Sequence, residues 1–170
     1  MASDADEKVA KLKQACDQAY RLHPNSCSHA VWYVISQYDS NHPYMQANQL
    51  IDYLTVNSKW QAVRAEELSK LANEGALVVG GLKTSPNGHA IAVYPGPEKP
   101  AGDYKYKDAA GKIQKLGPKG SYARAMSTSM GQWPGARSHG DKTVWDAWGR
   151  NDTFPKVKFW KYVGNAGGVV

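Results

Sequence analysis

The hydrophobic pattern of the chain changes period near residue 75, and this change restricts the folds that it can adopt. Before that point, helical spacing of apolar residues predicts helices over residues 5–22, 27–38, 45–55 and 65–73. After it, short apolar or alternating runs predict strands over residues 76–82, 89–94, 104–107, 112–116, 122–127 and 156–163, with a loop at 95–100. Helices first and strands afterwards favour an α+β fold with an antiparallel sheet.

Length and composition are those of one folded domain spanning residues 1–170. The chain has 170 residues and 42% hydrophobic residues, which is enough to bury a substantial core. It contains no apolar run near the roughly 18 residues that would cross a bilayer. Residues 1–7 are acidic and have no basic or apolar segment of the kind that begins a secretory signal. We therefore expect synthesis in the cytoplasm without a signal peptide, and no membrane insertion.

The net charge of +6 arises mainly from two groups of lysines in the second half of the chain. They are Lys105, Lys107, Lys112, Lys115 and Lys119, and then Lys156, Lys158 and Lys161. A basic surface suits an anionic polymer such as nucleic acid, a membrane or a cell wall bearing acidic peptides. An ordinary soluble surface of modest positive charge explains the same composition, and both interpretations stay open.

Cys27 lies where a loop, residues 24–26, gives way to a helix. The helix dipole and the unpaired N–H groups at a helix start favour a thiolate. His89 opens the apolar run 89–94 and is the candidate base that accepts the thiol proton. A cysteine on an early helix and a histidine on a later strand is the chain order of papain-like cysteine hydrolases, so this pair indicates amide-bond hydrolysis.

Other residues compete for these roles. The remaining histidines are His23, His29, His42 and His139, of which His29 is too close to Cys27 along a helix to face it. A zinc site can be imagined from Cys16, His23, Cys27 and His29, but their spacing fits no common ligand pattern. Cys16 falls on the apolar stripe of residues 5–22 and is predicted to be a core residue. A Cys16–Cys27 disulfide is the alternative, and it would consume the candidate nucleophile.

Several segments occur together and in the order found in one group of enzymes. They are residues 25–28 with the helix that follows, 47–54, 75–83 and 88–93. This set resembles the peptidoglycan amidase effectors of bacterial type VI secretion systems, which are relatives of the NlpC-type, papain-like cysteine peptidases. The resemblance covers residues 10–95 well and the last third of the chain loosely.

The resemblance implies a papain-like (NlpC-type) fold, with Cys27 as the nucleophile and His89 as the general base and acid. It also implies a third polar residue on the next strand. Residues 122–129 contain no Asp, Asn or His, so Ser127 is the candidate there, and a Cys-His dyad is the alternative. No cofactor or metal is expected.

The implied substrate is an amide bond in the peptide stem or crosslink of Gram-negative peptidoglycan. The D-Glu–diaminopimelate and diaminopimelate–D-Ala bonds both remain open. The implied setting is secretion by a type VI system into the periplasm of a target bacterium, where the protein acts as an antibacterial toxin. A cognate immunity protein is the expected partner, the chain itself is expected to be a monomer, and no nucleic acid is expected to bind.

Two other functions fit the same residues. A phage or host wall-lytic cysteine amidase of the CHAP type would use the same chemistry in another setting. A non-catalytic basic binding module would use the lysines together with aromatic contacts from Trp133, Trp145 and Trp148. Thiol reactivity separates the two classes, because a binding module does not need an activated cysteine.

Overall fold

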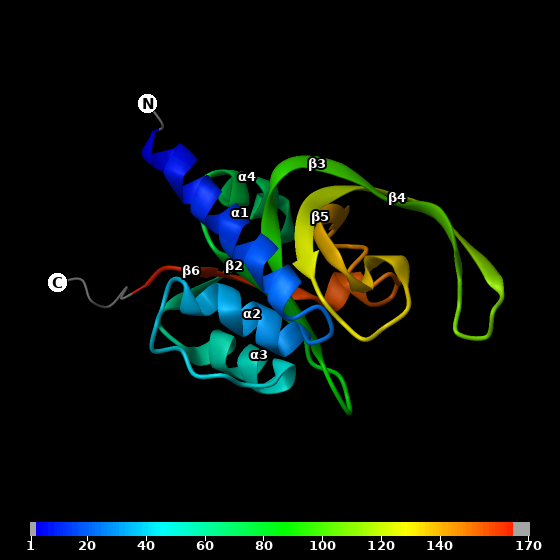
Figure 1. Ribbon diagram of the computed structural model, residues 1–170, viewed down its shortest axis with the longest axis horizontal. Coiled ribbons are helices and arrows are strands. Elements are labelled where there is room, and N and C mark those ends of the chain that lie inside the picture. Colours follow the sequence, from blue (N-terminus) through cyan, green and yellow to red (C-terminus); the bar gives the residue numbers. More distant parts are fainter. Residues whose placement is uncertain (1–2, 165–170) are drawn as a thin grey trace.

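The computed structural model describes residues 3–164. It begins with three helices, α1 (Asp4–Leu22), α2 (Cys27–Ser36) and α3 (Ala47–Val56), which pack against a sheet formed by later segments. A short 3₁₀ turn leads into a fourth helix, α4 (Leu68–Asn73). In Figure 1, α1 and α2 cross in front of the sheet, with α3 beside α2. No helix within residues 3–164 is long and apolar enough to span a bilayer.

The strands form one six-stranded antiparallel sheet in the order β1-β6-β2-β3-β4-β5. The strands are β1 (Trp60–Val63), β2 (Val78–Leu82), β3 (His89–Lys107), β4 (Ile113–Ser127), β5 (Ser138–Thr143) and β6 (Lys158–Tyr162). Three helices followed by a mainly C-terminal antiparallel sheet confirm the expected α+β class.

The sheet differs from the sequence prediction in several places, one being that the predicted strands 112–116 and 122–127 are joined in β4. The predicted loop at 95–100 is part of β3, where register shifts between Tyr94 and Gly102 accommodate the irregular pairing with β4. Prolines in this stretch lack an N–H donor, and such residues are tolerated at bulges. Strand β5 was not predicted because its sequence has no apolar alternation. It forms because it pairs with β4, and the Ser138 hydroxyl donates to the Ala125 carbonyl oxygen at 2.7 Å.

The C-terminal strand β6 occupies an interior position in the sheet, between β1 and β2. This insertion depends on a close approach of backbone to side chain. Gly80 on β2 pairs with Phe159 on β6, and a Cβ at Gly80 would lie 2.5 Å from the Phe159 ring. Glycine is therefore needed at residue 80 to let the aromatic ring cover the strand.

A single apolar core joins the helices to the sheet. Each of the first three helices buries a set of apolar residues, and the apolar runs on β2 and β3 are buried against them. Cys16 has no exposed surface and lies in this core, as predicted. Cys16 and Cys27 are both free thiols, so no disulfide joins them.

The distal parts of β3 and β4 leave the body of the molecule as a two-stranded ribbon, drawn at the right of Figure 1. The buried carboxylate of Asp146 anchors the base of this ribbon by accepting bonds from the Gly102 N–H and the Tyr104 hydroxyl, both at 3.0 Å. Farther out, Lys105 and Lys115 are exposed and are direct cross-strand partners. The ribbon is therefore anchored at its base by Asp146 and carries exposed lysines toward its tip.

Candidate active site

Cys27 is the first residue of α2, as predicted. The helix begins there because Ser26 is its N-cap, and the Ser26 hydroxyl accepts the His29 N–H at 3.2 Å. The preceding loop is held by Arg137, which donates to the Pro24 carbonyl at 3.2 Å and to Asn25 Oδ1 at 3.1 Å. The backbone around Cys27 is thus held on both sides of the loop–helix junction.

His89 is the first residue of β3, and its ring is fixed by Ser127 at the end of β4. His89 Nε2 lies 3.1 Å from Ser127 Oγ, and the Ser127 hydroxyl donates to the Ala136 carbonyl at 3.1 Å. Because the hydroxyl proton is used in that bond, Ser127 Oγ accepts the Nε2–H of His89. This arrangement selects the tautomer in which Nδ1 carries the free lone pair.

Cys27 and His89 lie in the wall of the same cavity, whose volume is about 450 Å³. Ser127 stands behind His89 and is not among the lining residues. The cavity is lined by Asn25, Ser26, Cys27, Ser28, Tyr44, Gln46, Ala47, Asn48, Pro86, Asn87, Gly88, His89, Ser129, Met130 and Trp133. The fold therefore brings Cys27 and His89 to one cavity, and Ser127 supports the His89 side chain.

None of the competing histidines reaches this cavity. His29 bonds the Ser26 hydroxyl through Nδ1 at 2.7 Å and stacks on Tyr44. His42 is buried against Tyr53, and His139 lies beside Tyr20. Within residues 3–164 no three His, Cys, Asp or Glu side chains are grouped closely enough to hold a metal ion.

Burial raises the pKa of the Cys27 thiol above its ordinary 9.0. The backbone N–H groups of Ala90, Ser28 and Cys27 itself lower the same pKa, but by less than burial raises it. The expectation that a helix start favours the thiolate is therefore wrong in its net direction for the unliganded site. The cost of desolvating the sulfur exceeds the stabilisation by the N–H groups.

Burial also lowers the pKa of His89, from 6.5 to about 4. Trp133 and Trp148 contribute to the apolar surroundings of His89. Their rings lie roughly perpendicular to the imidazole, at centroid distances of 6.1 and 5.1 Å. Both groups are consequently neutral near pH 7. The proton rests on the Cys27 sulfur, and the His89 Nδ1 carries a lone pair.

The neutral states of the Cys27 thiol and the His89 imidazole predict how the thiol reacts. We expect the rate of Cys27 alkylation by iodoacetamide to be low at pH 6 and to be still rising with pH at pH 9. The reason is that only the thiolate reacts, and burial raises the pKa of the Cys27 thiol above 9.0. Mass spectrometry of the alkylated protein measures each cysteine separately. Cys16 has no exposed surface and should react more slowly at every pH. A Cys27 rate that reaches its plateau by pH 7 would reveal a preformed ion pair and contradict this assignment.

Sequence reasoning missed the contacts that complete the site. Asn48 lay in a recognised segment but had no assigned role, and nothing in the local pattern linked Trp133 or Trp148 to His89. Trp145, expected as an exposed aromatic contact of a binding module, is 4% exposed. Trp145 is therefore in the protein interior, whereas Trp133 and Trp148 are partly exposed beside the imidazole.

Comparisons of the sequence with models of known protein families and with curated proteins found no match. The cavity that contains Cys27 and His89 and the ordered segments of the sequence are therefore the features that bear on function.

Proposed function

We propose that the protein is a cysteine hydrolase of papain-like, NlpC-type architecture that cuts an amide bond in the peptide stem or crosslink of Gram-negative peptidoglycan. The observation that carries the proposal is the shared cavity. It holds a thiol at a helix start and an imidazole whose other nitrogen is bonded to Ser127. The substrate class comes from the resemblance of residues 10–95 to peptidoglycan amidase effectors.

The reaction begins with proton transfer between two neutral groups. His89 Nδ1 takes the Cys27 proton as the sulfur attacks the carbonyl carbon, so a C–S bond forms and the carbonyl electron pair moves to oxygen. The N–H groups of Cys27 and Ser28 at the start of α2 are the candidate donors to that oxyanion. On collapse the C–N bond breaks, and His89 returns its proton to the leaving amine. Water then hydrolyses the thioester with His89 as base.

Ser127 orients the imidazole in this scheme and carries no charge. A hydroxyl that accepts from Nε2–H selects the tautomer, but it stabilises an imidazolium less than a carboxylate would. Its buried position agrees with such an orienting role. The proton transfers are therefore assigned to a Cys27–His89 dyad, with Ser127 as the residue that positions it.

The proposed setting is that of a type VI effector. Such a protein would be made in the cytoplasm, be delivered to the periplasm of a target bacterium and be neutralised in its own cell by an immunity protein. The exposed ribbon agrees with an anionic polymer as partner. Lys105 and Lys115 face each other across the strands, and like charges in that position disfavour the ribbon unless an anion lies between them.

A basic binding module without catalysis is the second candidate, and the same lysine pair is the observation that favours it. The module would need neither a cavity containing Cys27 nor a histidine held in one tautomer. A wall-lytic amidase of phage or host origin shares the proposed chemistry and differs only in setting.

The deciding experiment is digestion of purified muropeptides, followed by mass spectrometry. We expect products that have gained one water at a stem or crosslink amide, because a thioester intermediate resolves by hydrolysis. The masses of the fragments identify whether the D-Glu–diaminopimelate or the diaminopimelate–D-Ala bond is cut. Muropeptides that remain intact while still binding the protein would contradict the hydrolase and support the binding module.

A further inference from the structure

The segment 83–88 joins β2 to β3 and ends at the candidate base. Leu82 pairs with His89 at the end of the β2–β3 ladder, so this segment closes a hairpin next to the imidazole. Pro86, Asn87 and Gly88 also line the cavity. Whatever holds this turn therefore determines both one wall of the cavity and the backbone position of His89.

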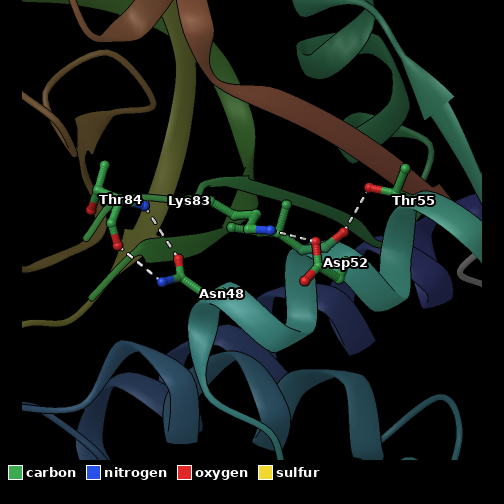
Figure 2. Close-up of polar contacts among 6 residues, drawn as sticks. Asn48, Asp52, Thr55, Lys83 and Thr84 are labelled. Carbon is green, nitrogen blue, oxygen red and sulfur yellow. Dashed lines mark hydrogen bonds and ion pairs between the residues drawn. The ribbon is translucent and has the colours of Figure 1, made fainter. Parts of the chain in front are cut away.

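Asn48, near the start of α3, makes two hydrogen bonds to this turn (Figure 2). Its Nδ2 donates to the Thr84 carbonyl at 2.9 Å, and its Oδ1 accepts the Thr84 N–H at 3.2 Å. The carboxamide thus satisfies a backbone donor and a backbone acceptor of one residue, as a neighbouring strand would. This double contact fixes Thr84 in orientation as well as in distance.

Gly88 brings the backbone just before His89 into contact with the same carboxamide. A Cβ at Gly88 would lie 2.2 Å from Asn48 Oδ1 and 2.7 Å from the Leu82 carbonyl oxygen. Only glycine fits there without displacing Asn48 or the end of β2. Asn48 is therefore packed against both ends of the turn, at Thr84 and at Gly88.

A second link joins the same helix to the same hairpin but lies outside the cavity. Lys83 Nζ is 2.8 Å from Asp52 Oδ1, and their side chains are 52% and 66% exposed (Figure 2). An exposed ion pair of this kind contributes little to stability. Asp52 therefore provides a matched control for Asn48, because it contacts the hairpin from α3 without bordering the cavity.

We propose that Asn48 is a positioning residue for His89, holding the 83–88 turn so that the imidazole keeps its place between the cavity and Ser127. Ser127 holds the ring from β4, and Asn48 holds the preceding backbone from α3. The catalytic consequence rests on the proposed hydrolase function, whereas the positioning itself does not.

The test compares Asn48→Ala with Asp52→Ala. Loss of the Asn48 contacts should lower kcat on muropeptides by about 10²-fold with little change in KM, because small misplacement of a catalytic group has effects of this size. The Asp52 variant should keep the wild-type kcat. Proton NMR of the His89 ring supplies a readout independent of activity. Its pKa, about 4 in the wild type, should rise toward 6.5 in Asn48→Ala as the site opens to water, and stay unchanged in Asp52→Ala.

The outcomes separate this inference from the proposed function. A wild-type His89 titration in folded Asn48→Ala would overturn the positioning role, whether or not the protein cuts muropeptides. A shifted titration in a protein that never shows hydrolysis would support positioning and reject the hydrolase. Asn48→Ser, whose hydroxyl is too short to reach both Thr84 groups, is expected to behave like Asn48→Ala and replaces it if that variant does not fold.

Discussion

Replacement of Cys27 by alanine should abolish muropeptide hydrolysis while leaving the protein folded. The expected loss in kcat is on the order of 10⁶-fold, the size found when the nucleophile is removed from a hydrolase whose groups act as a unit. Folding should be retained because the sulfur is at the cavity wall, outside the set of fully buried core residues. Muropeptide cleavage and circular dichroism, measured on the same preparation, check both parts of this expectation.

Cys16→Ala is the matched control, because it removes the other thiol from the same molecule. Cys16 is fully buried in the core, so its loss should reduce the free energy of unfolding by about 1 kcal/mol and leave kcat unchanged. Cleavage by a folded Cys27→Ala protein at the wild-type rate would refute the nucleophile assignment. If Cys16→Ala is fully folded but inactive, the assignment of Cys27 rather than Cys16 as the nucleophile would be wrong.

Replacement of His89 by alanine should have the second largest effect, lowering kcat by about 10²–10⁴-fold, the range of general acid–base catalysis. The pH profile of hydrolysis by the wild-type protein is the more specific test. Catalysis needs the unprotonated imidazole, and burial lowers the His89 pKa to about 4. Activity should therefore persist at pH 5–6 and fall only as the pH drops through about 4, whereas an ordinary histidine would lose activity near 6.5.

The control for His89 is His139→Ala, since His139 is exposed and lies outside the cavity. This variant should keep both the rate and the acid limb of the wild-type profile. Circular dichroism at each pH separates titration of the site from acid unfolding. If wild-type activity falls near pH 6.5, the imidazole is not desolvated. If kcat is undiminished in His89→Ala, His89 is not the base.

The parts of the fold that were predicted well depend on local pattern. The stripe containing Leu12 and Cys16 specified a helix because residues three and four apart share a helix face. The predicted loop-to-helix junction before Cys27 is also correct, because the Ser26 side-chain oxygen satisfies a free N–H at that helix start. The same local logic failed for β5, whose residues lack apolar alternation and become a strand only through pairing with β4.

The features of the candidate site also separate into those that follow from local sequence and those that follow from tertiary contacts. The sequence alone determined that a cysteine begins a helix and that a histidine begins an apolar strand, because capping and hydrophobic period are properties of neighbouring residues. Only the tertiary structure decided that His89 bonds Ser127, that Asn48 packs on the turn before it, and that Trp133 and Trp148 lie beside the imidazole. It also decided the direction of both pKa shifts, since desolvation depends on what the whole chain packs around a group and no short segment contains that information.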